Sequence, residues 1–315
     1  MAKKAAKKTA KKLVKTVKKS AKAVKKSVKA VKKPAKAAKK SVSKYETVLV
    51  EKNGDGITWV ILNRPEKRNA MSPQMHAEMD AVLEDLSTDP ETKVLVLTGA
   101  GKSYCAGQDL KLYFREGFKD MKLRFASSKA SNSWRWQRLS TFPKPTISMV
   151  NGYCFGGAFT HVCACDMAIS ANEATFGLSE INWGVLPGGL VSWNVADILN
   201  FRNAMYYAMT GETFNGKRAV EIGFVNKTVP LKNLRKETIK LAKVLMEKNP
   251  VALRTTKESI RNVRFLGPEV AYDYLRAKHD AMKLNDKSGG AEEGMKQFLD
   301  DKTYRPGFEA YKRST

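Results

Sequence analysis

The segment at residues 151–160, Asn-Gly-Tyr-Cys-Phe-Gly-Gly-Ala-Phe-Thr, constrains the fold more than any other part of this chain. An apolar, β-branched run at 146–150 leads into its Asn-Gly turn, and the Gly-Gly pair then opens an apolar helix. Glycines at a helix start admit another molecule close to the backbone, and the unpaired N–H groups there suit a developing oxyanion. Glu180 adds an ionisable group twenty residues later. The pattern therefore predicts a strand, a turn and a helix that build an oxyanion-binding site.

Strands alternate with helices along the rest of the folded region. The pattern predicts a hairpin from 47–52 and 56–63, a helix from Ser72 to about Leu86, and buried strands at 94–97 and 166–171. This alternation is typical of an α/β domain with ligand sites at the loops that leave the strands. Helix formers dominate from Asn249 onward. We therefore expect a tail at 1–44, a core at 45–248 and a helical region at 249–315.

The four cysteines indicate reduced, buried thiols in a cytoplasmic protein. They lie in apolar or glycine-containing segments and lack the C-x-x-C spacing of a zinc site; they are Cys105, Cys154, Cys163 and Cys165. His161 follows Thr160 but leaves the helix in another direction, so a packed histidine is expected, and it forms no metal-ligand pattern with His76 or His279. No apolar run approaches the eighteen residues of a membrane span.

Residues 1–44 form a lysine-rich, low-complexity segment. They contain nineteen Lys and no Asp, Glu or Arg, so of the net charge of +26 only +7 remains for the rest of the chain. Repulsion between like charges predicts a disordered or partly helical segment. Its composition resembles the tails of linker histones and bacterial histone-like proteins, and it favours nonspecific binding of nucleic acid or another polyanion. A solubilising extension without a partner is the alternative, and the lack of arginine disfavours a mitochondrial presequence.

Five segments together resemble the crotonase (enoyl-CoA hydratase/isomerase) superfamily over about residues 45–315. They are 63–71, 106–110, 151–160, 176–180 and 211–225. The resemblance implies a spiral of ββα units, a C-terminal helical trimerisation region, and trimers or hexamers that bind acyl-CoA. Coenzyme A is then part of the substrate, and no further cofactor or metal is expected.

Two positions narrow the expected reaction. The simple hydratases of the superfamily use two glutamates, of which Glu180 matches one, whereas the other falls on Thr160. A hydroxyl can orient water but cannot act as a base near neutral pH. The closest resemblance is to the p-hydroxycinnamoyl-CoA (feruloyl-CoA) hydratase/lyases, which carry serine there. This implies hydration followed by carbon–carbon cleavage, giving an aromatic aldehyde such as vanillin and acetyl-CoA.

The same resemblance assigns roles to individual residues. It implies that the backbone N–H groups of Gln108 and Gly157 hold the thioester oxygen, and that Glu180 is the acid and base. Tyr113 matches a tyrosine that binds the substrate phenol, and Trp183 is assigned to the substrate site. Two positions depart from the pattern, because Gln108 replaces a methionine and Arg276 falls where the family has a second phenol-binding tyrosine, with Tyr274 nearby.

The resemblance also implies a binding site for the CoA portion. It places the adenine and phosphates near residues that include basic side chains and that lie partly across a subunit boundary; they are Lys67, Arg68, Ala70, Phe298 and Lys302. Two alternatives remain open beside the hydratase/lyase. One is an enoyl-CoA hydratase or isomerase for another acyl-CoA, and the other is a scaffold protein that binds nucleic acid through residues 1–44.

Overall fold

The computed structural model describes residues 44–313, of which those from Tyr45 onward belong to one compact unit. The lysine-rich tail predicted at 1–44 lies outside the described residues except for Lys44. The strands are β1 Val48–Lys52, β2 Ile57–Leu62, β3 Val94–Gly99, β4 Ser103–Cys105, β5 Thr146–Val150, β6 Tyr153–Phe155, β7 Met167–Ala171, β8 Thr175–Gly177, β9 Phe214–Asn215 and β10 Lys227–Val229. The α-helices are α2 Pro73–Thr88, α3 Met121–Asn132, α4 Ala158–Ala164, α5 Val191–Ile198, α6 Phe201–Thr210, α7 Gly216–Glu221, α8 Leu231–Met246, α9 Pro250–Val263, α10 Pro268–Asn285 and α11 Gly290–Leu299.

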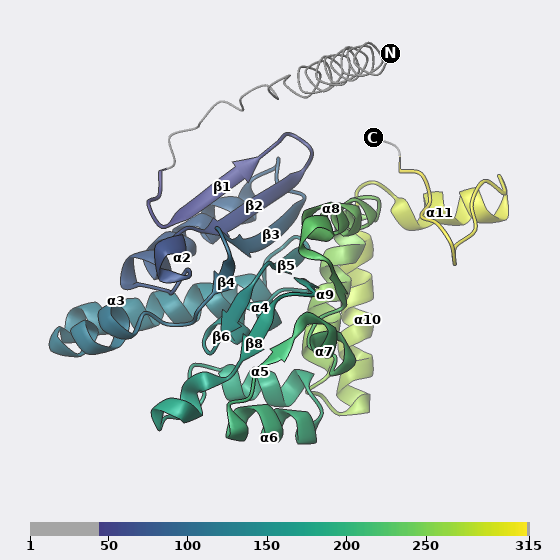
Figure 1. The fold of residues 1–315 in the computed structure, drawn as a ribbon. Helices are drawn as coiled ribbons and strands as arrows, with labels where there is room; N and C mark the ends of the chain where they lie inside the picture. Colours follow the sequence, from purple (N-terminus) through teal and green to yellow (C-terminus); the bar gives the residue numbers. More distant parts are fainter. Residues whose placement is uncertain (1–43, 314–315) are drawn as a thin grey trace, which may run out of the picture. The chain divides into compact units, whose positions relative to one another are not determined.

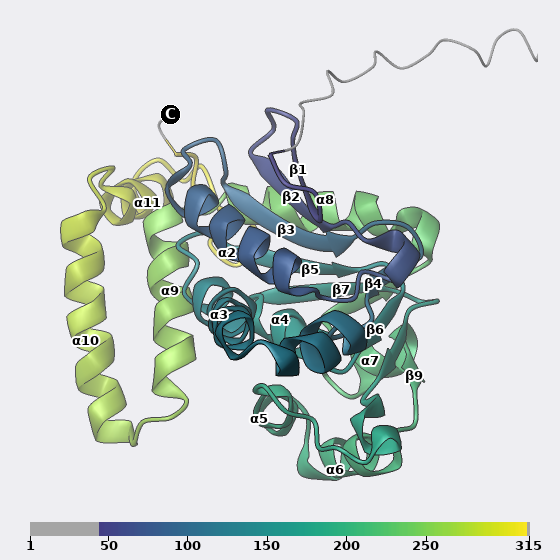
Figure 2. The ribbon, with the colours of Figure 1, turned by 90° about the vertical axis from the view of Figure 1, so that its left-hand side faces the viewer.

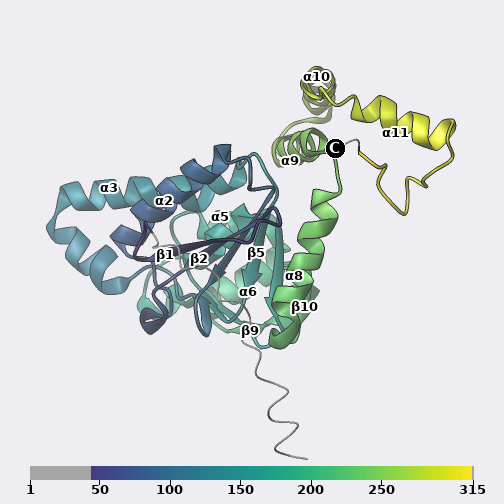
Figure 3. The same ribbon diagram turned by 90° about the horizontal axis from the view of Figure 1, so that it is seen from above.

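The larger sheet has six strands in the order β1-β2-β3-β5-β7-β10. The β1–β2 pair is an antiparallel hairpin, and each later strand runs parallel to its neighbour. The strands β2, β3 and β5 are buried throughout, which explains why they read as continuous apolar or β-branched runs rather than alternating ones. Helix α2 lies on one side of this sheet and α8 on the other (Figures 1 and 3).

A second sheet of four strands has the order β4-β6-β8-β9. The chain enters it by short connections after β3, β5 and β7, so that strands of the two sheets alternate along the sequence. Helix α4 contacts β7 of the larger sheet and β6 of the smaller one. This repeated passage between two sheets, with helices between the strand pairs, is the α/β spiral expected from the resemblance.

The C-terminal region is helical, as the sequence predicts. Helices α9 and α10 form an antiparallel hairpin, and α11 follows α10 (Figure 2). Asn249 caps α9 by accepting from the N–H groups of Val251 and Ala252, and Pro250 occupies the first turn.

The helix start predicted from Ser72 and Pro73 is confirmed. Ser72 is the N-cap of α2 and accepts a hydrogen bond from the Met75 N–H, with Pro73 as the first helical residue. The sequence reasoning did not anticipate α3 or the two π-helical segments beside it, 110–116 and 133–138.

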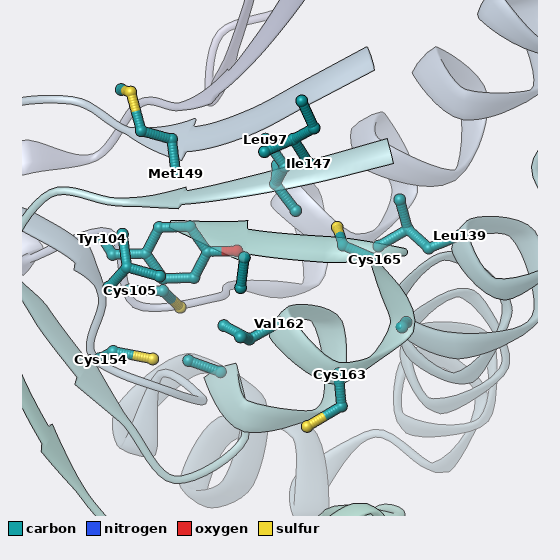
Figure 4. Packing of buried hydrophobic residues seen from close by; sticks show 14 of the residues in the cluster. Leu97, Tyr104, Cys105, Leu139, Ile147, Met149, Cys154, Val162, Cys163 and Cys165 are labelled. Carbon is teal, nitrogen blue, oxygen red and sulfur yellow. The ribbon is translucent and has the colours of Figure 1, made fainter. Parts of the chain in front are cut away.

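All four cysteines are buried and unbonded, as expected. Their sulfur atoms lie within the hydrophobic core, around Tyr104 and Val162 (Figure 4). Burial raises the pKa of the Cys105 and Cys165 thiols to about 12 and raises those of Cys154 and Cys163 as well.

Candidate active site

Two loops bring the Gln108 and Gly157 backbones together. A Cβ atom added to Gly107 would lie 3.5 Å from the Gly157 nitrogen, and one added to Gly157 would lie 3.6 Å from Cγ of Gln108. Neither N–H group donates a hydrogen bond to another residue in the described part of the chain. Gly107, at φ +88°, leaves no room for a side chain because its Cβ would meet the Phe155 carbonyl oxygen at 2.9 Å. Two free donors at one place can hold an oxyanion.

Glu180 lies directly beside this pair of donors. A Cβ on Gly156, which has φ +51°, would stand 2.8 Å from Oε1 of Glu180. The other carboxylate oxygen, Oε2, is buried and accepts no hydrogen bond from residues 44–313. Burial raises the pKa of Glu180 above its usual value, against a smaller opposing effect of its own backbone N–H. A half-buried carboxylate with a free oxygen and a raised pKa can exchange protons with a substrate.

Thr160 lies one turn along α4 and is 1% exposed. Its hydroxyl donates a hydrogen bond to the Gly189 carbonyl oxygen at 3.1 Å, which connects α4 to the loop that follows Glu180. No hydrogen bond joins Thr160 to Glu180 among the residues described. Its expected catalytic role stays a prediction.

A buried hydrogen-bond network lies behind the two donors, and sequence reasoning missed most of it. Trp134 Nε1 donates to Nδ1 of His76 at 2.8 Å, so the remaining proton of this neutral ring is on Nε2, which lies 2.8 Å from Oε1 of Gln108. Burial, together with the charge of Arg135, lowers the pKa of His76 to about 3. The ring of Tyr113 packs edge-on against His76 with 5.2 Å between centroids. Tyr113 therefore packs against the histidine that is hydrogen-bonded to Gln108.

The loop predicted to contact CoA is tied to the same site. Arg64 forms an ion pair with Asp109 at 2.9 Å, next to Gln108, and Asn69 donates to the carbonyl oxygens of Ala100 and Ser103. Lys67 and Arg68 are exposed at the surface of this loop, with Arg68 over the Tyr153 ring at 5.2 Å. These basic groups are available to a phosphate, and Ala70, half-buried, follows them.

The structure of one chain does not assemble every predicted site residue. Arg276 is exposed on α10, which packs against α9, and Phe298 lies on α11, apart from β4 and β6 (Figures 1 and 2). Lys302 is exposed beyond α11. Trp183, 67% exposed, follows Glu180 in a short 3-10 helix.

Comparison with known proteins decides the family. The model of the enoyl-CoA hydratase/isomerase family matches residues 51–307. The chain belongs to this family. An acyl-CoA substrate is therefore consistent with the family and with a site that combines the Gln108 and Gly157 N–H groups with the Glu180 carboxylate. No helix among residues 44–313 is long and apolar enough to cross a membrane, and no His, Cys, Asp or Glu cluster in that range is arranged to hold a metal ion.

Members of the family resemble the chain over nearly their whole lengths. A hydroxycinnamoyl-CoA hydratase-lyase of Pseudomonas fluorescens is 55% identical over 86% of this chain and 98% of its own. A putative enoyl-CoA hydratase of Thermus thermophilus is 31% identical, over 82% and 99% of the two chains. Among solved structures, a Geobacillus kaustophilus enoyl-CoA hydratase has a TM-score of 0.74 at 30% identity, covering 84% of this chain and 98% of its own. The crotonase fold expected from the sequence is confirmed.

Proposed function

We propose that the protein hydrates 4-hydroxycinnamoyl-CoA thioesters, such as feruloyl-CoA and p-coumaroyl-CoA, and cleaves the product to an aromatic aldehyde and acetyl-CoA. The relative that is 55% identical carries the name hydroxycinnamoyl-CoA hydratase-lyase, and the match covers 86% of this chain and 98% of that protein. The observation that carries the proposal is the position of Glu180, with its unpaired oxygen, beside two backbone donors. The free thiols support a reducing, cytoplasmic location.

In the first stage water adds across the double bond. Glu180 takes a proton from the water while the water oxygen bonds to the β-carbon. The electron pair of the double bond then moves toward the thioester oxygen. The N–H groups of Gln108 and Gly157 hold the negative charge that develops there, and donors of this kind contribute about 3–4 kcal/mol each. Glu180 then returns its proton to the α-carbon, which completes the hydration.

In the second stage the bond between the α- and β-carbons breaks. Glu180, again a carboxylate, takes the β-hydroxyl proton, the electron pair of the O–H bond forms the new carbonyl, and the aldehyde leaves. The electrons of the broken carbon–carbon bond form the acetyl-CoA enolate, which the same two N–H groups hold until Glu180 returns the proton to the α-carbon. Electron release from the substrate's para oxygen favours bond breaking, and in this proposal Tyr113 would bind that oxygen. The packing of Tyr113 against His76, which lies beside Gln108, supports this role.

A substrate panel tests this function. The protein is incubated separately with feruloyl-CoA, p-coumaroyl-CoA and crotonyl-CoA, and aldehyde, hydroxyacyl-CoA and acetyl-CoA are followed by chromatography. We expect aldehyde and acetyl-CoA from both aromatic thioesters. Hydration of crotonyl-CoA without any aldehyde from either aromatic thioester would favour the alternative, an enoyl-CoA hydratase or isomerase.

We further propose that CoA is bound by two copies of the chain within a trimer or hexamer. Lys67, Arg68 and Ala70 would supply one part of the site, while Phe298 and Lys302 of another copy would supply the rest. The separation of α11 from the catalytic loops within one chain supports this arrangement. Arg276 of a neighbouring copy would likewise stabilise the phenolate of the bound substrate. Analytical ultracentrifugation is expected to give a mass of three or six chains, and a monomer with full activity would contradict the proposal.

We also propose that residues 1–44 bind nucleic acid or another polyanion without sequence preference. Their nineteen lysines support it, because neutralised phosphates release counterions and make affinity fall with salt. Retention on immobilised DNA is expected to decrease steeply with salt and to be lost in a variant that lacks residues 1–44. Unchanged retention of that variant would show that the tail does not bind. DNA compaction by a protein without turnover would favour the scaffold alternative.

A further inference from the structure

Arg135 is a buried cation without an acidic partner. It lies in the π-helical segment 133–138 and is 5% exposed. No Asp or Glu in the described part of the chain forms an ion pair with it, and burial lowers the pKa of its guanidinium. Burying an uncompensated charge is costly, so natural proteins retain such groups mainly where the charge is used. Its surroundings indicate what that use is.

The guanidinium connects the two residues that supply the free backbone donors. Its Nη1 donates to the Gly157 carbonyl oxygen at 3.1 Å, and its Nε donates to Oγ of Ser131 at 3.0 Å. The Gln108 side chain donates from Nε2 to that same Ser131 oxygen at 3.3 Å. A continuous chain of hydrogen bonds therefore runs from Gln108 through Ser131 and Arg135 to Gly157.

The rest of the network fixes the direction of this chain. Because Trp134 determines the tautomer of His76, the ring donates to Oε1 of Gln108, and the amide must direct its Nε2 toward Ser131. Nη2 of Arg135 lies 3.0 Å from the position that a Cβ atom on Gly189 would take. Gly189 is also the residue whose carbonyl oxygen accepts a hydrogen bond from the Thr160 hydroxyl. His76, Gln108 and Ser131 each have hydrogen-bond partners within this network, which restricts their side-chain conformations.

We propose that Arg135 is a positioning residue that sets the oxyanion site, holding Gly157 directly and Gln108 through Ser131, while its unpaired positive charge favours the enolate. The proposal rests on the proposed function in one respect, namely that a thioester oxygen occupies the space between the two donors. The link between Gln108 and Arg135 requires the side-chain amide of Gln108, which donates to the Ser131 hydroxyl oxygen.

The test compares Arg135→Gln and Arg135→Lys with Arg138→Gln, a matched control. Arg138 lies in the same segment but is more exposed and forms ion pairs with Asp80 and Glu84, outside the site. For Arg135→Gln we expect kcat to fall about 10-fold to 100-fold, less than for the loss of a direct donor, with KM little changed. Arg135→Lys, which retains the charge, is expected to recover part of the loss. Arg138→Gln is expected to keep the wild-type kcat.

A spectrum separates positioning from general stability. Feruloyl-CoA is a conjugated thioester, so hydrogen bonds to its carbonyl oxygen should move its absorbance to longer wavelength. The shift is measured for feruloyl-CoA bound to Glu180→Gln, alone and combined with Arg135→Gln or Arg138→Gln. The shift is expected to shrink only with Arg135→Gln. An unchanged shift and kcat in folded Arg135→Gln would overturn the proposal.

Two further variants apply if Arg135→Gln fails to fold. Arg135→Lys keeps a buried cation, and Gln108→Met breaks the network at its other end while leaving the backbone donor. Both are expected to reduce kcat and the spectral shift, and wild-type values in both would overturn the proposal. If the wild type hydrates only crotonyl-CoA, the proposed function fails but the role of Arg135 can still be tested. The Arg135 variants are then assayed on crotonyl-CoA, because its thioester oxygen would occupy the same site.

Discussion

At Glu180 the structure combines a carboxylate, partial burial and an oxygen without a hydrogen-bond donor. This combination suits proton transfer but does not suit stability, since the backbone N–H of Glu180 offsets only part of the desolvation of the charge. Replacing Glu180 by Gln should therefore abolish turnover, with a loss in kcat of at least about 10²–10⁴-fold, while binding of the CoA thioester survives. Single-turnover kinetics and a binding titration measure the two effects, and near-normal kcat would reject Glu180 as the acid and base.

The same substitution should stabilise the protein in a pH-dependent way. Burial raises the pKa of Glu180 in the folded state above its unfolded value. Ionisation of Glu180 therefore destabilises the folded state. The full destabilisation is present at pH values above the folded-state pKa, and none is present at pH values below the unfolded-state pKa. Glu180→Gln should raise Tm at pH 8, and the difference should vanish near pH 4. A difference in Tm that is independent of pH would contradict this origin.

Gly156 provides a second test at the residue scale. Its φ of +51° disfavours any side chain, and a methyl group there would stand 2.8 Å from Oε1 of Glu180. Gly156→Ala should displace the carboxylate and reduce kcat by about 100-fold, as misplacements of about 1 Å do. Gly54→Ala is the control, because Gly54 also has positive φ but no atom within 4 Å of its added Cβ. Equal kcat for the two variants would contradict the steric account.

Among the elements, α4 carries both the site and an unsatisfied histidine. His161 is packed as expected, between the rings of Tyr104 and Trp134, yet neither of its nitrogens has a partner among the residues described. Burial lowers its pKa well below the usual value, so the ring stays neutral. His161→Leu should increase the free energy of unfolding by about 1–3 kcal/mol in urea denaturation.

His76 is the matched control for this substitution. It is equally buried, but Trp134 and Gln108 satisfy both of its nitrogens. His76→Leu should destabilise the protein because it leaves those two partners without hydrogen bonds. If both substitutions changed stability in the same direction, hydrogen-bond satisfaction would not explain the difference.

The elements also show where sequence reasoning succeeded and failed. Helix α2 was predictable because Ser72 and Pro73 mark its start and its buried face is apolar. Helix α3 was not, because the residues it buries are Ser127 and Ser131, which leave no hydrophobic periodicity. Arg135 was missed with it. The one sequence feature that could have indicated a buried Arg135 is its position between two tryptophans, Trp134 and Trp136.

At the scale of the molecule, strand and helix patterns in the sequence sufficed for the α/β class. The meeting of Gly157, Gln108 and Glu180 was expected from the family resemblance of the segments that carry them, and the structure brings the three together. The sites of Arg276, Phe298 and Lys302 could not be placed, because α10 and α11 sit apart from the catalytic loops in one chain.

The buried thiols give a prediction for the whole core. Because burial raises their pKa values, little thiolate exists at neutral pH, and access is blocked by the surrounding side chains. A thiol-reactive dye should modify the native protein slowly and label four cysteines after unfolding in guanidinium. Rapid labelling of the native protein would show that the core opens more readily than its packing indicates.

The central claim is that one pair of backbone donors and one carboxylate support both hydration and carbon–carbon cleavage. The most direct measurement is the stoichiometry of products from a limiting amount of feruloyl-CoA, with wild type and Glu180→Gln in parallel. We expect equal amounts of aromatic aldehyde and acetyl-CoA from the wild type, and neither product from the variant. Accumulation of the hydroxyacyl-CoA without aldehyde, or equal product formation by Glu180→Gln, would contradict it.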